Sequence, residues 1–179
     1  MDKITSIAIS GQNSTGKTTL CTVLSKRLQW NHVKIGQVFR GLAKKYNLEI
    51  EQFGSVPDDF LMEVDSEMQK RMASETSIIW DGRLSCFYAR DRVDIFKIFC
   101  KADLEVRSYR ASVRDKVTID VAKGQILSRE EEEKRVFTRL YNLEDPYDKQ
   151  WIDLEVDTST NTPEEIADFI LTIIAQRKG

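Results

Sequence analysis

The chain has 179 residues and a formal net charge of −2 at pH 7, and 41% of its residues are hydrophobic. These values describe an ordinary globular protein of one compact domain, and they exclude a disordered chain and a strongly basic nucleic-acid binder. No apolar run approaches the length of a membrane span. We therefore expect a single domain over residues 1–179, in the cytoplasm, with neither nucleic acid nor a membrane as its partner.

Short apolar runs and apolar residues at helical spacing alternate along the chain. The runs predict strands over residues 4–10, 33–35, 77–81, 93–100 and 151–157. Helical spacing and capping signals predict helices over 20–28, 36–46, a stretch from near Pro57, 103–114, and a stretch after the Thr162–Glu165 capping box. Strands that alternate with helices predict an α/β fold, with a five-stranded parallel sheet and helices on both faces.

The stretch from about 114 to 148 departs from this rhythm. Residues 128–135 contain no apolar side chain, and Ser128 with Glu131 fits a capping box after a break at Gly124. A helix without an apolar stripe is not anchored deeply in a core. Two interpretations stay open: a solvated surface helix, or a mobile lid whose arginines meet a ligand.

Three cysteines and one histidine were considered as metal ligands or catalysts. Cys21, Cys86 and Cys100 are odd in number, and their spacing fits no zinc motif. Cys21 and Cys100 fall in apolar patterns, so we interpret them as buried free thiols in a reducing compartment. His32 lies beside the start of a predicted strand, and we interpret it as a surface or half-buried residue rather than a catalyst.

The segment from Gly11 to Thr18 reads Gly-Gln-Asn-Ser-Thr-Gly-Lys-Thr, between the first strand and the first helix. This spacing is typical of the P-loop, where backbone N–H groups and a helix N-terminus hold a polyphosphate. We expect Lys17 to reach the β- and γ-phosphates and the Thr18 hydroxyl to face Mg²⁺. The residues predicted to bind ATP here are Gly11, Asn13, Ser14, Thr15, Gly16, Lys17, Thr18 and Thr19.

Asp81 ends the third predicted strand, and Gly82 and Arg83 follow it. A carboxylate at this place in a P-loop protein holds Mg²⁺, directly or through water, so Thr18 and Asp81 are the predicted metal site. Arg83 offers a bidentate fork that suits a phosphate dianion at the same edge of the sheet. Other arginines that could neutralise phosphate charge are Arg40, Arg107, Arg110, Arg114, Arg129, Arg135 and Arg139.

Together these segments resemble the nucleoside monophosphate kinases, and most of all the short, archaeal-like cytidylate kinases. The resemblance runs from Ile4 to the last helix and includes Gly36-x-x-Phe39-Arg40, Asp81-Gly82-Arg83-Leu84 and the charged run from Arg129 to Arg135. It implies a three-layer P-loop NTPase fold with an acceptor-binding helical insert over about 36–75 and a helical lid over about 114–148. It also implies ATP as phosphoryl donor, Mg²⁺ as cofactor, and CMP or dCMP as acceptor.

The resemblance assigns roles to individual side chains as well. It implies that Arg40 and Arg83 hold the monophosphate of the acceptor, with Gly82 beside them. It also implies that Asp65 and Gln69 read the acceptor base. Arg110 would lie near the base of ATP, and Arg129 and Arg135 would close over the transferring phosphate from the lid. The implied catalytic set is Lys17, Arg83, Arg129 and Arg135.

The chain departs from the family pattern in the loop interior, Gln12-Asn13-Ser14-Thr15, although its spacing is kept. Two further departures concern the acceptor: Ile35 stands where bacterial members often have a serine, and Leu84 replaces an aspartate. The acceptor therefore stays open, with AMP, another nucleoside monophosphate, shikimate or dephospho-coenzyme A as alternatives. A nucleotide-binding protein that has lost catalysis is a further alternative. A GTPase-like switch is disfavoured because the chain lacks an Asn-Lys-x-Asp motif. We expect a monomer or weak dimer whose partners are small-molecule nucleotides.

Overall fold

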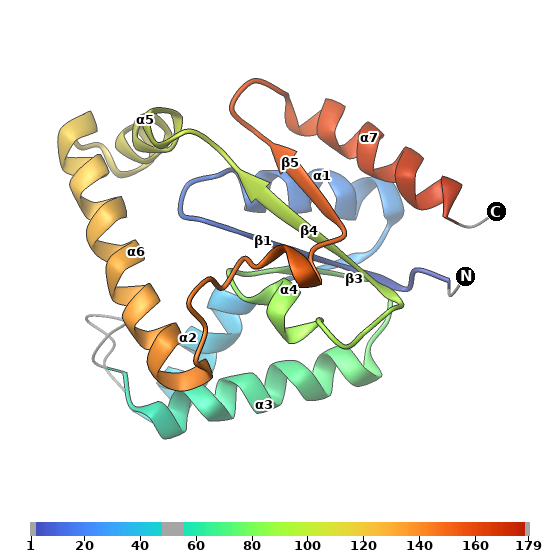
Figure 1. Cartoon of the computed structure of the whole chain (residues 1–179), viewed down its shortest axis with the longest axis horizontal. Coiled ribbons are helices and arrows are strands. Elements are labelled where there is room, and N and C mark those ends of the chain that lie inside the picture. Colours follow the sequence, from blue (N-terminus) through green and yellow to red (C-terminus); the bar gives the residue numbers. More distant parts are fainter. Residues whose placement is uncertain (1–2, 48–55, 178–179) are drawn as a thin grey trace.

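The computed structural model describes residues 3–47 and 56–177. Its strands form one parallel sheet in the order β2-β3-β1-β4-β5 (Figure 1). The strands are β1 (Ser6–Gly11), β2 (Asn31–Lys34), β3 (Ile78–Asp81), β4 (Ile95–Lys101) and β5 (Leu154–Asp157). The predicted five-stranded parallel sheet is confirmed.

Helices cover both faces of this sheet (Figure 1). They are α1 (Lys17–Leu28), α2 (Ile35–Lys45), α3 (Asp58–Ser74), α4 (Ser85–Tyr88), α5 (Leu104–Asp115), α6 (Ile119–Tyr141) and α7 (Pro163–Gln176), with a short 3₁₀ turn, η2 (Lys149–Trp151), before β5. The α1 and α7 helices pack on one face, whereas α2, α3 and α4 pack on the other. This is a three-layer α/β arrangement.

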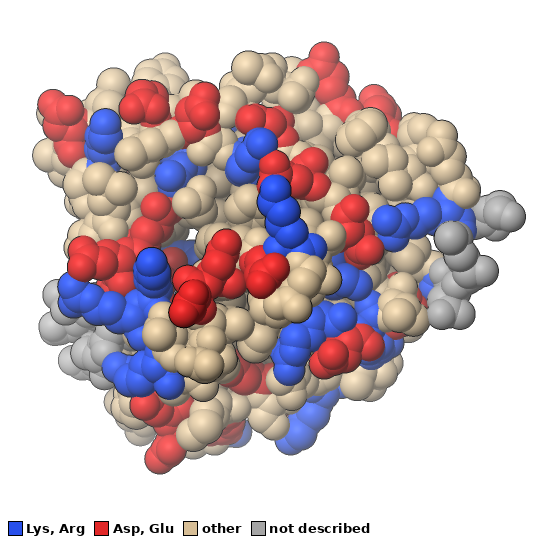
Figure 2. Space-filling model, viewed as in Figure 1, with Lys and Arg blue, Asp and Glu red and all other residues tan. Residues whose placement is uncertain are grey.

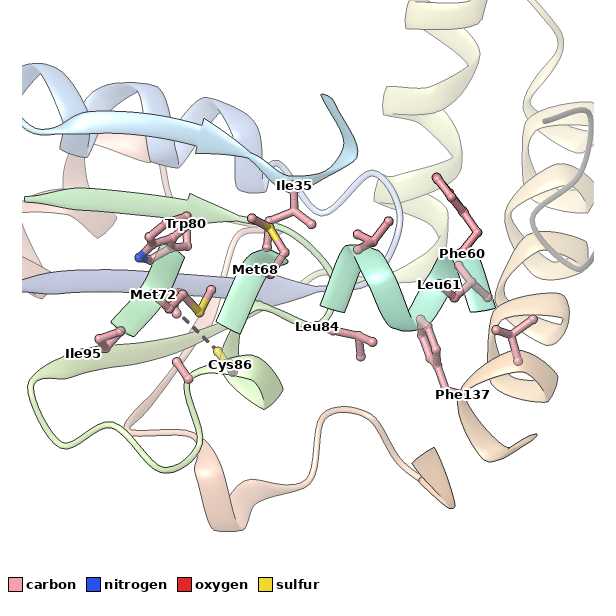
Figure 3. Packing of buried hydrophobic residues seen from close by; sticks show 14 of the residues in the cluster. Ile35, Phe60, Leu61, Met68, Met72, Trp80, Leu84, Cys86, Ile95 and Phe137 are labelled. Carbon is pink, nitrogen blue, oxygen red and sulfur yellow. Dashed lines mark hydrogen bonds between the residues drawn. The ribbon is translucent and has the colours of Figure 1, made fainter. Parts of the chain in front are cut away.

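The central strand β1 explains why the core has two halves. All of its residues are buried, and successive side chains point to opposite faces of the sheet. Ile7 and Ile9 therefore join the cluster under α1 and α7, while Ala8 joins the cluster under α3. Figure 3 shows the cluster under α3, in which Met68 and Met72 from α3 lie near Trp80 of β3.

The polar stretch predicted to start its own helix lies inside α6 instead. Neither Gly124 nor Ser128 begins or ends the helix, and the cap is Thr118, whose Oγ1 accepts a hydrogen bond from the Val121 amide at 3.3 Å. The predicted break and the Ser128–Glu131 capping box are therefore wrong. Apolar residues on either side of the polar run anchor the helix: Ala122, Ile126, Val136 and Phe137 are buried.

Other helix and strand ends differ by a few residues. Ile35 begins α2 instead of ending β2, and Trp151 lies in η2 instead of β5. Asp103 is the N-cap residue of α5, but its side chain makes no capping hydrogen bond. The capping box of Thr162 and Glu165 at α7 is confirmed.

Residues 48–55 of the predicted acceptor-binding insert lie outside the described residues. Within the described part, no helix is long and apolar enough to cross a membrane. On the face seen in Figure 2, basic and acidic side chains are interspersed rather than gathered by sign.

Candidate active site

The loop between β1 and α1 has a backbone that only glycine allows at two points. Gly11 has φ 150°, and a Cβ there would lie 2.3 Å from the carbonyl oxygen of Cys100. Gly16, the N-cap of α1, has φ 85° in the left-handed region. The glycines therefore set the path of the loop and direct the N-terminus of α1 toward its centre.

Lys17 lies inside this loop. Its Nζ donates hydrogen bonds to the carbonyl oxygens of Gly11 at 2.7 Å and Gln12 at 2.5 Å. Burial, together with the nearby positive charge of Arg83, lowers the pKa of Lys17 to about 8. A bound polyphosphate would oppose both effects, because its negative charge stabilises the protonated ammonium group.

Asp81 lies at the C-terminal end of β3, opposite the start of α1. The Thr18 hydroxyl donates to Asp81 Oδ2 at 2.8 Å, and His32 Nε2 lies 3.1 Å from the same oxygen. Hydroxyl and carboxylate oxygens are hard ligands that suit Mg²⁺. The chemistry of this donor pair fits the cofactor predicted from the sequence.

Asn13 links the loop to Arg83, which follows β3. Its Oδ1 accepts a hydrogen bond from Arg83. Its Nδ2 is buried and has no hydrogen-bond partner. A buried amide donor without a partner carries a desolvation cost, and an anionic oxygen bound in the loop would relieve it.

The loop opens into a cleft of about 1330 Å³ between the sheet edge, α2, α3 and α6. It brings together most of the residues predicted for ATP, metal, acceptor and lid. Those that line it are Asn13, Ser14, Lys17, Thr18, Arg40, Asp65, Asp81, Gly82, Arg83, Arg129 and Arg135. Ile35 and Leu84, the two departures from the family pattern, also line it.

A carboxylate from α6 occupies the middle of the arginine group. Glu133 is buried, with 4% of its surface exposed, and it forms ion pairs with Arg83 and with Arg129, the latter at 3.1 Å. Burial, together with the positive charge of Arg129, lowers the pKa of Arg83 to about 9. An anion between these two guanidinium groups is thus part of the structure without ligand.

The far end of the cleft has apolar and aromatic walls around one carboxyl group. Asp65, on α3, accepts hydrogen bonds from the hydroxyls of Tyr88 and Tyr141. Burial raises the pKa of Asp65, and the two tyrosine hydrogen bonds oppose that rise. Phe39 and Phe137 line the same end. The result is a largely apolar end of the cleft with one carboxyl group, which two tyrosine hydroxyls hold in place.

Some predicted residues do not reach the cleft. Gln69 is exposed on α3 and is not among the lining residues, so the structure separates it from Asp65. Thr19 is exposed on α1 beside the loop. Arg110 bonds to the carbonyl oxygen of Thr158 at 2.6 Å, with its NH1 group 3.5 Å from the Thr15 carbonyl, so it lies outside the cleft but against the loop.

Four residues of the site were not predicted to act there: Glu133, Tyr88, Tyr141 and His32. Glu133 carries a local signal, since it is four residues after Arg129 in a helical segment. The two tyrosines are far from Asp65 in sequence and lie on α4 and α6. No spacing rule would have joined them.

The fold and the site together define a class of protein. A parallel sheet carries a glycine-bounded loop, a lysine and a threonine at the start of a helix, and a carboxylate at the end of the neighbouring strand. This arrangement is that of P-loop phosphotransferases. The solved shikimate kinase from Acinetobacter baumannii in complex with shikimate has the same fold, with a TM-score of 0.62 at 15% identity, over 98% of this chain and 95% of that chain.

Sequence comparison narrows the class to a family. The model of the cytidylate kinase-like family matches residues 6–160. The cytidylate kinase of Sulfolobus acidocaldarius is 33% identical over 174 residues, covering 96% of this chain and 94% of the relative. That of Methanopyrus kandleri is 32% identical over 170 residues, covering 89% and 87%. The chain belongs to the cytidylate kinase-like family and is an ATP-dependent phosphotransferase.

Proposed function

We propose that this protein transfers the γ-phosphoryl group of ATP to CMP or dCMP, which gives ADP and CDP or dCDP. The observation that carries the proposal is one continuous cleft, which joins the phosphate loop, an arginine group and a pocket with a single carboxyl anchor. Membership of the cytidylate kinase-like family supports the same conclusion.

The donor is assigned to the loop side of the cleft. Backbone N–H groups of the loop and the N-terminus of α1 would hold the β- and γ-phosphates, with Lys17 as a point charge between them. Ser14, Thr15 and Thr19 would add contacts, and Arg110 would lie at the edge of the ATP base. Mg²⁺, when bound, would neutralise charge on the transferring phosphate, and Thr18 with Asp81 would hold it.

The acceptor phosphate is assigned to Arg83 and Arg40. Arg83 adjoins Asn13 of the loop and lines the cleft, so a monophosphate held by its fork would face the γ-phosphate. Arg129 and Arg135 would approach from α6, which is the proposed lid. An ionised acceptor phosphate is already a nucleophile, so no general base is required, and positioning with charge neutralisation would supply the rate.

The base is assigned to the pocket around Asp65. A carboxylate accepts hydrogen bonds from the exocyclic amino group of cytosine, whereas the O4 oxygen of uracil or thymine would face it as a second acceptor. The hydroxyls of Tyr88 and Tyr141 hold the carboxylate in place. The pocket thereby favours an amino-bearing base, which supports CMP over UMP and dTMP.

A coupled ADP-release assay with ATP, Mg²⁺ and a panel of CMP, dCMP, UMP, AMP and dTMP tests the proposal. We expect CMP and dCMP to have the largest kcat/KM. A preference for AMP would keep the class and change the acceptor. Turnover with none of the panel would overturn the assignment and favour shikimate, dephospho-coenzyme A or lost catalysis.

The Asp65→Asn variant tests the base assignment separately. Its amide retains the size of the carboxyl group and can donate a hydrogen bond to O4 of uracil. We expect the ratio of kcat/KM for CMP over UMP to fall by about tenfold or more, since one mispaired polar group in a buried site costs about 1–3 kcal/mol. An unchanged ratio would remove Asp65 from base recognition. Asp59→Asn, at an exposed position in the first turn of α3, is the matched control.

A further inference from the structure

A cysteine, a histidine and an aspartate meet in the layer between α1 and the sheet. The thiol of Cys21, the imidazole of His32 and the carboxylate of Asp81 place one donor atom each within 4.8 Å of one another. They come from α1, β2 and β3. We propose that these three side chains form a binding site for a borderline-soft divalent cation of the Zn²⁺ type, distinct in ligand chemistry from the Mg²⁺ site of the proposed function.

The geometry suits one ion. Bonds of about 2.0 Å to nitrogen and oxygen and about 2.3 Å to sulfur place tetrahedral donors about 3.3–3.6 Å apart. His32 Nε2 and Asp81 Oδ2 are already 3.1 Å apart, so the cation would replace their hydrogen bond with only a small movement. Three protein ligands leave one position for water.

The ligand types select the metal. Thiolate sulfur and imidazole nitrogen favour Zn²⁺ and its neighbours in the first transition row, whereas Mg²⁺ takes oxygen ligands. Zn²⁺ is balanced by one thiolate and one carboxylate, with the imidazole neutral, so the occupied site carries no net charge. Formation of the thiolate releases the Cys21 proton to solvent.

Two of the three ligands are shielded from solvent, and the third reaches it. Cys21 is fully buried and Asp81 is 6% exposed, so bound metal would be shielded from most competing ligands. The His32 side chain is 13% exposed and gives the site its route to solvent. Cys21 is a free thiol, and no disulfide removes it as a ligand.

The proposed Zn²⁺ site and the proposed Mg²⁺ site both use Asp81, so the two metals would compete for it. Zn²⁺ on Asp81 withdraws the carboxylate that the proposed function assigns to Mg²⁺. Zn²⁺ would then inhibit phosphoryl transfer in competition with Mg²⁺. This consequence rests on the proposed function, but the binding itself does not.

Binding is tested first, on untagged full-length protein. Co²⁺ is the spectroscopic probe, because a cobalt–thiolate bond gives a near-ultraviolet charge-transfer band, and Zn²⁺ should displace it at one equivalent. His32 is the only histidine of the chain, so its ring nitrogen signals in NMR report coordination without overlap. We expect Zn²⁺ to shift the Nε2 signal strongly and the Co²⁺ band to appear in the wild type.

Two variants and one control decide the ligands. Cys21→Ser should lose the Co²⁺ band, and His32→Gln, which keeps the thiol, should weaken Zn²⁺ binding by about tenfold or more. Cys86→Ser is the control, because Cys86 is equally buried but packs in the cluster on the opposite face of the sheet. Thermal unfolding of each variant identifies any that fails to fold. A wild type without the band, or a Cys21→Ser protein that keeps it, would overturn the site.

Inhibition is the second measurement. Zn²⁺ should inhibit the wild type, excess Mg²⁺ should restore turnover, and Cys21→Ser should resist Zn²⁺ while its activity without Zn²⁺ changes by less than about twofold. Zn²⁺ binding without inhibition would support the Zn²⁺ site and reject the competition with Mg²⁺ for Asp81. An absence of kinase activity would reject the proposed function and leave the Co²⁺ and NMR results to decide the site.

Discussion

The phosphate loop and the acceptor side of the cleft differ in what holds their polar groups. In the loop, backbone carbonyls receive the Lys17 ammonium, and the Thr158 hydroxyl donates to the carbonyl oxygen of Thr15 at 2.6 Å. On the acceptor side, charged side chains pair with each other, as Arg83 and Arg129 do with Glu133. The loop is thus shaped before a ligand arrives, whereas on the proposed acceptor side a phosphate would have to replace an internal carboxylate.

The largest effect that would test this contrast is expected at the loop. Lys17→Ala removes the point charge from the donor phosphates while leaving the glycines that set the backbone. We expect kcat to fall on the order of a thousandfold with little change in the melting temperature, measured by the coupled assay and by thermal unfolding. Lys26→Ala, at an exposed position of the same helix, is the control. An active Lys17→Ala enzyme would refute the donor assignment.

The next effect is expected at Arg83. Arg83→Ala should raise the KM for the acceptor by about a hundredfold and change the KM for ATP by less than about threefold, because a lost bidentate ion pair affects one substrate. Arg83→Lys keeps the positive charge but not the bidentate guanidinium group, so its KM for the acceptor should lie between those of the wild type and Arg83→Ala. Steady-state kinetics with each substrate varied gives both constants. Equal changes in both KM values would place Arg83 between the substrates rather than on the acceptor.

Glu133 offers a smaller effect of opposite sign. Glu133→Gln removes the negative charge that occupies Arg83 and Arg129 while keeping the size of the side chain. We expect the monophosphate to bind about three- to tenfold more tightly, since less internal pairing must be broken. Calorimetric titration with CMP measures it. Glu132→Gln, which also lines the cleft, is the control. Weaker binding would mean that Glu133 positions the arginines instead of competing for them.

The smallest expected effect is the number of protons that the protein takes up when ADP binds. The pKa of Lys17 is lowered to about 8 mainly by burial, so near that pH the free protein carries a partly deprotonated lysine. Bound ADP raises the pKa again, and binding near pH 8 should therefore take up about half a proton. At about pH 6.5 Lys17 is already protonated and the uptake should vanish. Calorimetry in two buffers of different ionisation enthalpy measures it, and Lys17→Met should show none at either pH. Proton release at pH 8 would contradict the assignment.

The loop, the sheet and Asp81 were predictable because their signals are local. Eight consecutive residues set the loop, and an apolar run that ends in an acid sets β3. The continuity of α6 is not evident from residues 128–135, because the apolar side chains that anchor the helix, such as Ile126 and Val136, lie outside this polar run. Helices are stabilised by tertiary packing more than by local sequence. Residues 128–135 alone therefore do not show how firmly the helix is anchored in the core.

The side-chain clusters were not predictable from spacing. Asp65 meets Tyr88 and Tyr141 from two other helices, and the pairing of Arg83 with Glu133 spans fifty positions of chain. Cys21 and His32 come together with Asp81 only because β2 and β3 pair side by side under α1. Residues far apart in sequence are joined by the sheet order, which short motifs do not encode.

The continuity of α6 has a mechanical consequence. With 23 residues it is a rod of about 34 Å. Phe137 near one end is seated in the large core beside α3, whereas Ala122 and Ile126 near the other end belong to a small separate cluster with α5. If the helix turned by about 10° around Phe137, its Ile119 end would move by about 5 Å and Arg129 by about 2 Å. A displacement at the α5 end would therefore reach Arg129 at less than half its size.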